Sequence, residues 1–432
     1  MKRYELTVAE DNILKTINED WLGRNKKLIN LMKLLNNLNE NFIISIDGVW
    51  GSGKTFFVKQ LKYISNNLDS ISYFKQNKDY DAIKNFSEKH LVVYYNAWEN
   101  DNHETPLESL IYNVLNEYPK YKNFISNPTK TFAAAKPILQ NLIEMVTKGI
   151  ITKECFEQLK SFEDLEENVN TIEEKKKALN KLFNLIIENN KRILLIVDEL
   201  DRCKPDYAVK MLETLKHFYN NDRLTILVVT NNNQLSHTVK HFYGYGFDGY
   251  SYLNKMYDTV ITLEIENLEN YVQNHCSIMA KTHLPENMSF LLFKHLFFSY
   301  RECNKYMSMY RIVEPYINYK DAFGRDINSF ESSMILPMTI ALKIKNIDIY
   351  NKFINGEGEE FIKEFIKSID NIEKHKEYKD WFIEILKVPQ SETLEESFIR
   401  QYKKIFESND KYREFPYFEA ISLLGNKINF SN

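Results

Sequence analysis

Short, uninterrupted runs of apolar residues recur along the first 265 residues, and each ends in glycine or polar residues. Such runs are typical of buried strands in a parallel sheet that helices cover on both faces. Between the runs, apolar residues repeat with helical spacing. The pattern therefore predicts an α/β fold around a parallel sheet. The runs lie at residues 42–46, 91–95, 192–197, 224–230 and 260–263.

The helical pattern divides the chain further. Two helices are expected within residues 1–40, with a break at Gly23. Polar, asparagine-rich sequence follows from about residue 63 to about residue 89. From about residue 266 onward the spacing is helical almost throughout. We expect three parts: a core that includes a helical insertion at about 107–190, a helical lid, and a helical C-terminal extension. Their bounds are 1–265, 266–345 and 346–432.

The first apolar run leads into a glycine-rich stretch that fits the pattern G-x-x-x-x-G-K-[ST]. In this phosphate-binding loop, glycines let the backbone N–H groups face a polyphosphate, and the following helix adds its N-terminal partial charge. Lys54 is expected to reach the β- and γ-phosphates, and the Thr55 hydroxyl to ligate Mg²⁺. The expected nucleotide-binding residues here are Gly48, Trp50, Gly51, Ser52, Gly53, Lys54, Thr55 and Phe56.

A second acidic motif follows the run at 192–197. Asp198 is placed to hold Mg²⁺ as a Walker B carboxylate, and Glu199 to orient or deprotonate an attacking water. Two acids that merely cap a buried strand would look the same, but the upstream phosphate loop favours a nucleotide site. A polar residue at the end of the next strand, Thr230 or Asn231, is the candidate sensor of the γ-phosphate.

Composition narrows the class of protein. The 432 residues are 44% hydrophobic and carry a net charge of −4, with no basic stripe, so nucleic-acid binding is not indicated. The four cysteines are scattered without a C-x-x-C pair, which predicts a reducing compartment. No apolar run reaches the length of a membrane span, and the N-terminus lacks a signal peptide. The expectation is a cytoplasmic protein.

With both nucleotide motifs present, the chain resembles the KAP P-loop NTPases. The resemblance implies an ATPase core with a five-stranded parallel sheet of the ASCE type, a helical lid, and ATP and Mg²⁺ as ligands. It also implies frequent use in bacterial antiviral defence or in membrane-associated assemblies. The segments that carry it are Leu22-Gly23-Arg24, Gly48 to Thr55, Asn96-Ala97-Trp98 with Asp101 and Pro106-Leu107, Asp198 to Cys203 before Pro205, and Ser299 to Glu302.

This chain departs from that family in two ways. Many members insert membrane helices between the nucleotide motifs, whereas residues 132–150 here carry too many polar side chains to span. The family's Walker B motif often reads Asp-Asp-Leu-Asp-Arg-Cys, and Glu199 replaces the second aspartate. A longer carboxylate side chain suits activation of a water.

Three arginines complete the candidate site. Arg24 lies in a segment that packs on the base in many nucleotide-binding ATPases, although an ordinary helix–helix corner would also use it. Arg202 and Arg301 are the candidates for charge stabilisation at the γ-phosphate, and a salt bridge to neighbouring acids is the alternative for each. The expected catalytic residues are Lys54, Asp198, Glu199, Arg202 and Arg301.

The predicted function is a Mg²⁺-dependent ATPase that acts as a nucleotide-driven switch in bacterial anti-phage defence. We expect a protein partner or effector encoded nearby, and the sequence is also compatible with a homo-oligomer. One alternative is an assembly or scaffold ATPase for a membrane or cytoskeletal partner. A GTPase switch is less favoured, because residues 230–233 lack the lysine and aspartate of an N-K-x-D motif. A scaffold that binds nucleotide without turnover is the remaining alternative.

Overall fold

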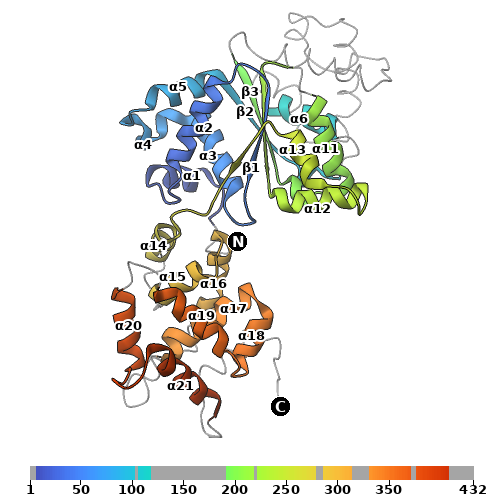
Figure 1. Ribbon diagram of the computed structural model, residues 1–432. Helices are drawn as coiled ribbons and strands as arrows, with labels where there is room; N and C mark the ends of the chain where they lie inside the picture. The colour runs from blue at the N-terminus through green and yellow to red at the C-terminus, as the bar shows by residue number, and fades with distance from the viewer. Residues whose placement is uncertain are drawn as a thin grey trace, which may run out of the picture. The chain divides into compact units, whose positions relative to one another are not determined.

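The computed structural model in Figure 1 groups the chain into two compact units, Thr7–Glu266 and a second unit within Asn267–Asn432. Most of the predicted helical insertion, residues 118–190, falls outside the described residues, as does the polar segment 132–150. The residues that the structure describes are 6–102, 106–117, 191–217, 221–278, 286–313, 330–370 and 376–407.

The first unit is built on a five-stranded sheet in the order β2-β3-β4-β1-β5, with every neighbouring pair parallel. All five predicted strands are therefore confirmed, as is the α/β class. Strand β4 lies between the strand before the phosphate loop and the strand before the acidic motif. The strands are β1 (Phe42–Asp47), β2 (His90–Asn96), β3 (Arg192–Asp198), β4 (Leu224–Thr230) and β5 (Thr259–Thr262).

Helices cover both faces of this sheet (Figure 1). On one side lie α1 (Glu10–Asn18), α2 (Asn25–Asn37), α3 (Lys54–Asn67), α4 (Ser72–Lys75) and α5 (Tyr80–Lys89). On the other side lie α6 (Pro106–Glu117), α11 (Pro205–His217), α12 (Asn232–Tyr243) and α13 (Gly249–Met256). The doubly covered sheet explains why its strands read as continuous apolar runs.

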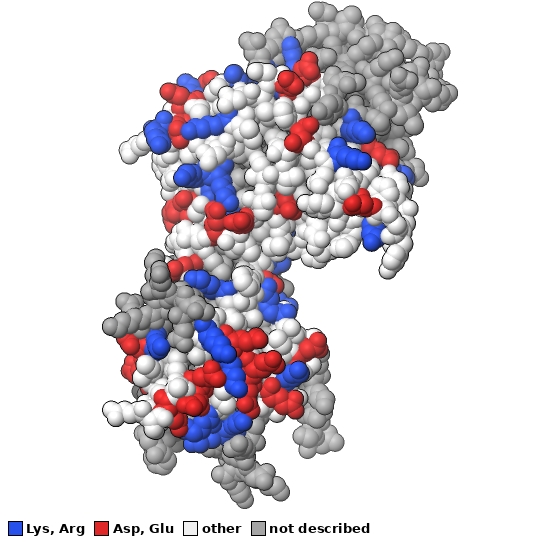
Figure 2. Space-filling model, viewed as in Figure 1, with Lys and Arg blue, Asp and Glu red and all other residues white. Residues whose placement is uncertain are grey.

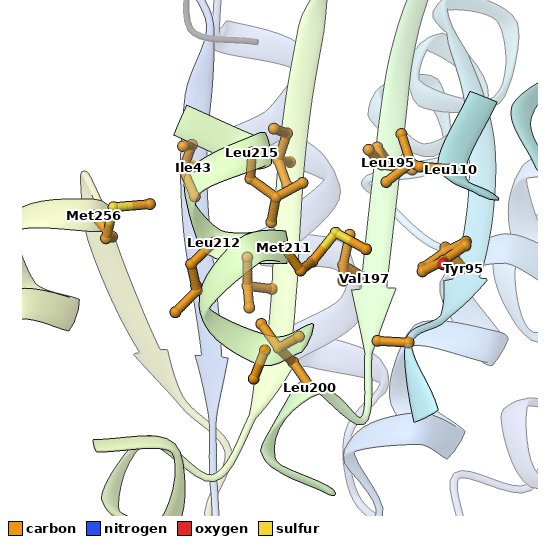
Figure 3. Packing of buried hydrophobic residues seen from close by; sticks show 14 of the residues in the cluster. Ile43, Tyr95, Leu110, Leu195, Val197, Leu200, Met211, Leu212, Leu215 and Met256 are labelled. Atoms are coloured by element: carbon orange, nitrogen blue, oxygen red, sulfur yellow. The ribbon is translucent and has the colours of Figure 1, made fainter. Parts of the chain in front are cut away.

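Side chains alternate between the two faces along each strand, which decides where the acidic motif points. Leu195 and Val197 of β3 pack in the core beneath Met211 and Leu215 of α11 (Figure 3). Asp198 follows Val197 and so lies on the opposite face, with α3. That face also carries the helix that begins at the phosphate loop.

The second unit is helical in its described residues, as predicted. The described parts of the predicted lid and C-terminal extension fall within this one unit, so their division at 345/346 stays a prediction. Its helices are α14 (Leu268–Ile278), α15 (Glu286–His295), α16 (Tyr300–Val313), a π-helical turn (Glu331–Ile335), α17 (Leu336–Lys345), α18 (Ile347–Ile354), α19 (Glu359–Asp370), α20 (Lys376–Leu386) and α21 (Leu394–Glu407).

Two surface properties bear on partners. On the face drawn in Figure 2, basic and acidic side chains are interspersed over the described surface. Among the described helices, none combines the length and the apolarity that crossing a membrane requires.

Candidate functional site

The phosphate loop joins β1 to α3 and turns through left-handed backbone at two glycines. Gly51 has φ of 80° and Gly53 has φ of 83°, values that side chains with a Cβ rarely adopt. Gly53 caps α3, so the first N–H groups of that helix face the loop. This geometry leaves backbone donors and the positive end of a helix dipole at the carboxyl edge of the sheet.

The loop is also tight enough to require glycine at its start. A Cβ at Gly48 would lie 2.9 Å from the Leu263 carbonyl oxygen and 2.9 Å from the Ser52 hydroxyl. Ser52 is fully buried, and its hydroxyl has no hydrogen-bond partner among the described residues. A buried orphan donor within a glycine loop is the feature expected where a phosphate oxygen binds.

Lys54, the first residue of α3, folds back over this loop. Its Nζ donates to the carbonyl oxygens of Gly48 at 2.6 Å and Val49 at 3.2 Å. The side chain is 9% exposed, and this burial lowers the pKa of its ammonium, while the carboxylates of Asp201 and Asp198 act in the opposite direction. A cation so placed is available to a polyphosphate in the loop.

The structure joins the two predicted motifs at Asp198. The Thr55 side chain lies close enough to the Asp198 carboxylate to lower its pKa, and Oδ1 of that carboxylate accepts from the Glu199 N–H at 2.8 Å. Asp198 is only 1% exposed, and burial raises its carboxyl pKa to about 6, although these neighbours lower it. The two predicted Mg²⁺ ligands, far apart in sequence, are therefore neighbours.

Glu199 stands on a sharp turn directly after β3. Its φ of 62° is unusual for a residue with a side chain, and such backbone strain gathers at functional sites. Its Oε1 lies 2.9 Å from Nη1 of Arg202, and its Oε2 accepts a 3.4 Å hydrogen bond from Asn96 Nδ2. The Arg202 guanidinium also lies over the Trp98 ring, 5.5 Å from its centroid. The salt bridge proposed as the alternative role for Arg202 is therefore present.

Trp50 links the phosphate loop to the turn after the acidic motif. Its indole Nε1 donates to the Asp201 carboxylate, and its ring is 48% exposed. Asp201 in turn is nearly buried and is the carboxylate with the largest effect on Lys54. The contact ties the position of the loop to the segment that carries Arg202.

The tip of β4 holds the two sensor candidates in different ways. Thr230 is fully buried, and its hydroxyl has no partner among the described residues. The side chain of Asn231 instead caps α12 by accepting from the Gln234 N–H at 3.3 Å. The Asn232 N–H donates to Asp47 Oδ1 at 2.8 Å, which fixes this tip to the end of β1.

Three predicted residues remain, and none of the contacts described above involves them. Arg24 is 1% exposed and donates to the Glu264 carbonyl at 2.6 Å, at the start of α2. Phe56 is buried in the first turns of α3. Arg301 is exposed on α16 and belongs to the second unit. The roles of all three stay predictions.

Sequence reasoning gave no role to two polar residues of β2 that contact the acidic motif. The Tyr94 hydroxyl donates to Asp198 Oδ2 at 2.9 Å, and Asn96 contacts Glu199 as described above. A polar residue at a strand end, such as Asn96, could have been singled out. Tyr94 carries no such signal, because an aromatic residue inside a strand is ordinary.

The residues present fit a Mg²⁺–nucleoside triphosphate. Backbone donors, the buried Ser52 hydroxyl and Lys54 suit a polyphosphate, while the Thr55 hydroxyl and the Asp198 carboxylate supply the hard oxygen ligands that Mg²⁺ prefers. No group of three or more metal-binding side chains occurs in the part of the chain that the structure describes. Mg²⁺ bound through one carboxylate, substrate phosphates and waters needs no such group.

Comparison with solved structures found distant similarities. The ORC2 protein of Aeropyrum pernix, solved as ADPNP–ADP complexes, shares 13% identity over 88% of this chain and 86% of that one, with a TM-score of 0.38. PCH-2 of C. elegans shares 11% identity over 94% and 72%, with a TM-score of 0.23. No curated protein matches the sequence significantly.

Comparison with family models gives a direct assignment. The model described as the KAP family P-loop domain matches residues 24–289, which is more than half of the chain. The match spans the phosphate loop, the acidic motif and all five strands of the sheet. The chain therefore belongs to the KAP family of P-loop NTPases.

Proposed function

We propose that this protein is a Mg²⁺-dependent ATPase whose nucleotide cycle operates a conformational switch. The observation that carries the proposal is the proximity of the Thr55 side chain to the Asp198 carboxylate, which brings together the ends of the two nucleotide motifs. Lys54 and the loop amides bind and orient the phosphates. Thr55 and Asp198 would hold Mg²⁺, which would supply positive charge against the triphosphate.

Glu199 is the proposed base for the attacking water. In the structure both of its carboxylate oxygens are engaged, Oε1 by Arg202 and Oε2 by Asn96. A carboxylate so engaged accepts a proton poorly, so hydrolysis requires that Arg202 release it. The Arg202 guanidinium cannot keep its salt bridge to Glu199 and make an equivalent contact with a γ-phosphate at the same time. Binding of triphosphate would draw the guanidinium to the phosphate and free the base, which couples the nucleotide state to the turn after β3.

The test of nucleotide binding is Lys54→Ala. Because this change removes the cation that the loop holds for the phosphates, ATP binding measured by calorimetry in Mg²⁺ should be abolished. Lys62→Ala, two turns further along α3 and paired with Glu117, is the matched control and should retain ATP affinity. Equal ATP affinity in wild type and Lys54→Ala would remove the basis for the proposal.

We further propose that the switch serves bacterial anti-phage defence, with a protein effector encoded nearby. Membership of the KAP family supports a role of this kind, since the resemblance implies frequent use in antiviral defence or in membrane-associated assemblies. The same Lys54→Ala allele tests it in a plaque assay, expressed with the neighbouring genes. We expect phage plating to be reduced on cells that carry the wild-type allele and restored on cells that carry Lys54→Ala. Equal plating of a broad phage panel on both alleles would count against this role.

A further inference from the structure

The carboxylate of Asp198 depends on a neighbour in β2 that the nucleotide motifs do not include. Asp198 is almost completely enclosed, and a buried carboxylate is costly unless hydrogen bonds satisfy it. One donor is the Glu199 N–H, 2.8 Å from Oδ1, and the other is the Tyr94 hydroxyl, 2.9 Å from Oδ2. The Thr55 side chain, which itself belongs to the proposed metal site, lies close enough to lower the pKa of this carboxyl.

Strand register explains why Tyr94 reaches this carboxylate. Strands β2 and β3 are parallel, with Asn96 opposite Asp198 and Tyr94 opposite Ile196. Residues two apart share a face, so Tyr94, Asn96 and Asp198 all lie on the α3 side of the sheet. A tyrosine two positions before the pair is long enough to place its hydroxyl at the carboxylate.

The tyrosine ring is itself held from the other side. Lys59 Nζ lies 3.3 Å from the centroid of the Tyr94 ring, and Lys59 stands one helical turn after Thr55 on α3. A cation over an aromatic face is attracted to it, more strongly when partly removed from water. The ring is only 9% exposed. It therefore lies between the helix that carries Thr55 and the strand that carries Asp198.

We propose that Tyr94 is a positioning residue of the Mg²⁺ site, which orients the Asp198 carboxylate through its hydroxyl while Lys59 holds its ring. The proposal rests on the assignment of Asp198 and Thr55 as Mg²⁺ ligands. The phenol donates to Oδ2 and the Glu199 N–H donates to Oδ1, which together fix the rotation of the carboxylate, and the remaining lone pairs would be available to Mg²⁺. Residues behind a metal ligand commonly change metal affinity by about 10–100-fold when they are removed.

The test is Tyr94→Phe, which removes only the hydroxyl. Binding of a fluorescent ATP analogue is titrated with Mg²⁺ from an EDTA baseline, and electron paramagnetic resonance of Mn²⁺ reads metal binding directly. We expect the Mg²⁺ concentration for half-maximal effect to rise about tenfold, with nucleotide affinity in EDTA unchanged. A purely structural role would instead lower the affinity in EDTA as well.

Tyr95→Phe is the matched control. Tyr95 is the next residue of β2, is fully buried, and directs its hydroxyl to Ser109 and Tyr207 on the other face of the sheet. Its removal should leave the Mg²⁺ requirement unchanged. An unchanged Mg²⁺ requirement in Tyr94→Phe, in a protein with the melting temperature of wild type, would overturn the proposal.

A second variant decides the matter if Tyr94→Phe fails to fold. Lys59→Met keeps the phenol and most of the stem of Lys59 but removes the cation over the ring, so we expect the Mg²⁺ requirement to rise about threefold. An unchanged requirement in Lys59→Met would overturn the proposal. Wild type without any Mg²⁺-dependent nucleotide binding would mean that the proposed ATPase function fails, which is a distinguishable result.

Discussion

Replacing Asp198 by asparagine should abolish the Mg²⁺ dependence of nucleotide binding and yet stabilise the protein without ligand. Burial raises the carboxyl pKa of Asp198 from 3.8 to about 6, which means that the fold disfavours the ionised form. A shift of about two pKa units corresponds to about 3 kcal/mol at neutral pH. Asparagine has nearly the same shape but no charge, so this cost should disappear.

The sign follows from proton binding. Between about pH 4 and pH 6, the folded protein binds more protons at Asp198 than the unfolded chain does. The contribution of this residue to the free energy of unfolding therefore falls as pH rises through that range, and the full cost applies above it. The asparagine variant lacks this slope. The stability difference between variant and wild type should thus be largest above pH 7 and vanish near pH 4.

The assay is denaturant unfolding in EDTA across pH, followed by tryptophan fluorescence. Trp21, Trp50 and Trp98 lie in the unit Thr7–Glu266, so a Trp381→Phe background confines the signal to that unit. For a unit of this size, about 3 kcal/mol corresponds to a rise in melting temperature of roughly 6 °C. The exposed Asp222, changed to asparagine, is the control and should show no such gain. A variant no more stable than wild type at pH 8 would refute the reasoning.

Two further variants test the acidic motif and the base of the sheet. Glu199→Gln should keep ATP affinity but slow hydrolysis by roughly 10²-fold or more, because a catalytic base is lost; wild-type turnover in that variant would make Asp201 the next candidate. His90 is buried at the start of β2, and burial lowers its imidazole pKa to about 4. The contribution of the neutral ring to the free energy of unfolding is therefore fully present above pH 6.5, and it is lost as pH falls toward 4. His90→Phe, which keeps the ring stacked on Phe86, should flatten the acid limb of the unfolding free energy, and an unchanged limb would exclude His90 as its source.

The fold was predictable because its signals are local. Each strand is a run of apolar residues, because helices bury both faces of the sheet, and each run is bounded by polar or glycine residues. The phosphate loop is likewise local, since the backbone turns at Gly51 and Gly53 need glycine whatever surrounds them. These features can be recognised in the sequence without knowledge of any distant contact.

The polar stretch before β2 shows the limit of that reasoning. Residues 64–89 are rich in asparagine, lysine and serine, yet they contain α4 and α5. Helix α5 has only two fully buried anchors, Ile83 and Phe86. Two buried apolar residues in ten give a weak periodic signal, and the helix is stabilised by packing against α2.

The partners of the acidic motif were not predictable, because they depend on the register and the order of strands. Tyr94 and Asp198 stand 104 positions apart and meet only through one of the registers that two apolar runs could adopt. For Arg202 the sequence offered two roles, and the structure contains the salt bridge to Glu199.

Strand order has a further effect that no motif encodes. With β4 between β1 and β3, the ends of the two motif-bearing strands stand about 10 Å apart, twice the spacing of neighbouring strands. A backbone at β1 therefore cannot contact Asp198 directly, and only α3, which returns over the sheet from the phosphate loop, brings Thr55 to it. Lys54 follows β1, Glu199 follows β3, and Thr230 ends β4, the strand between them. Had β3 been adjacent to β1, the two motifs would have followed strands at half this separation.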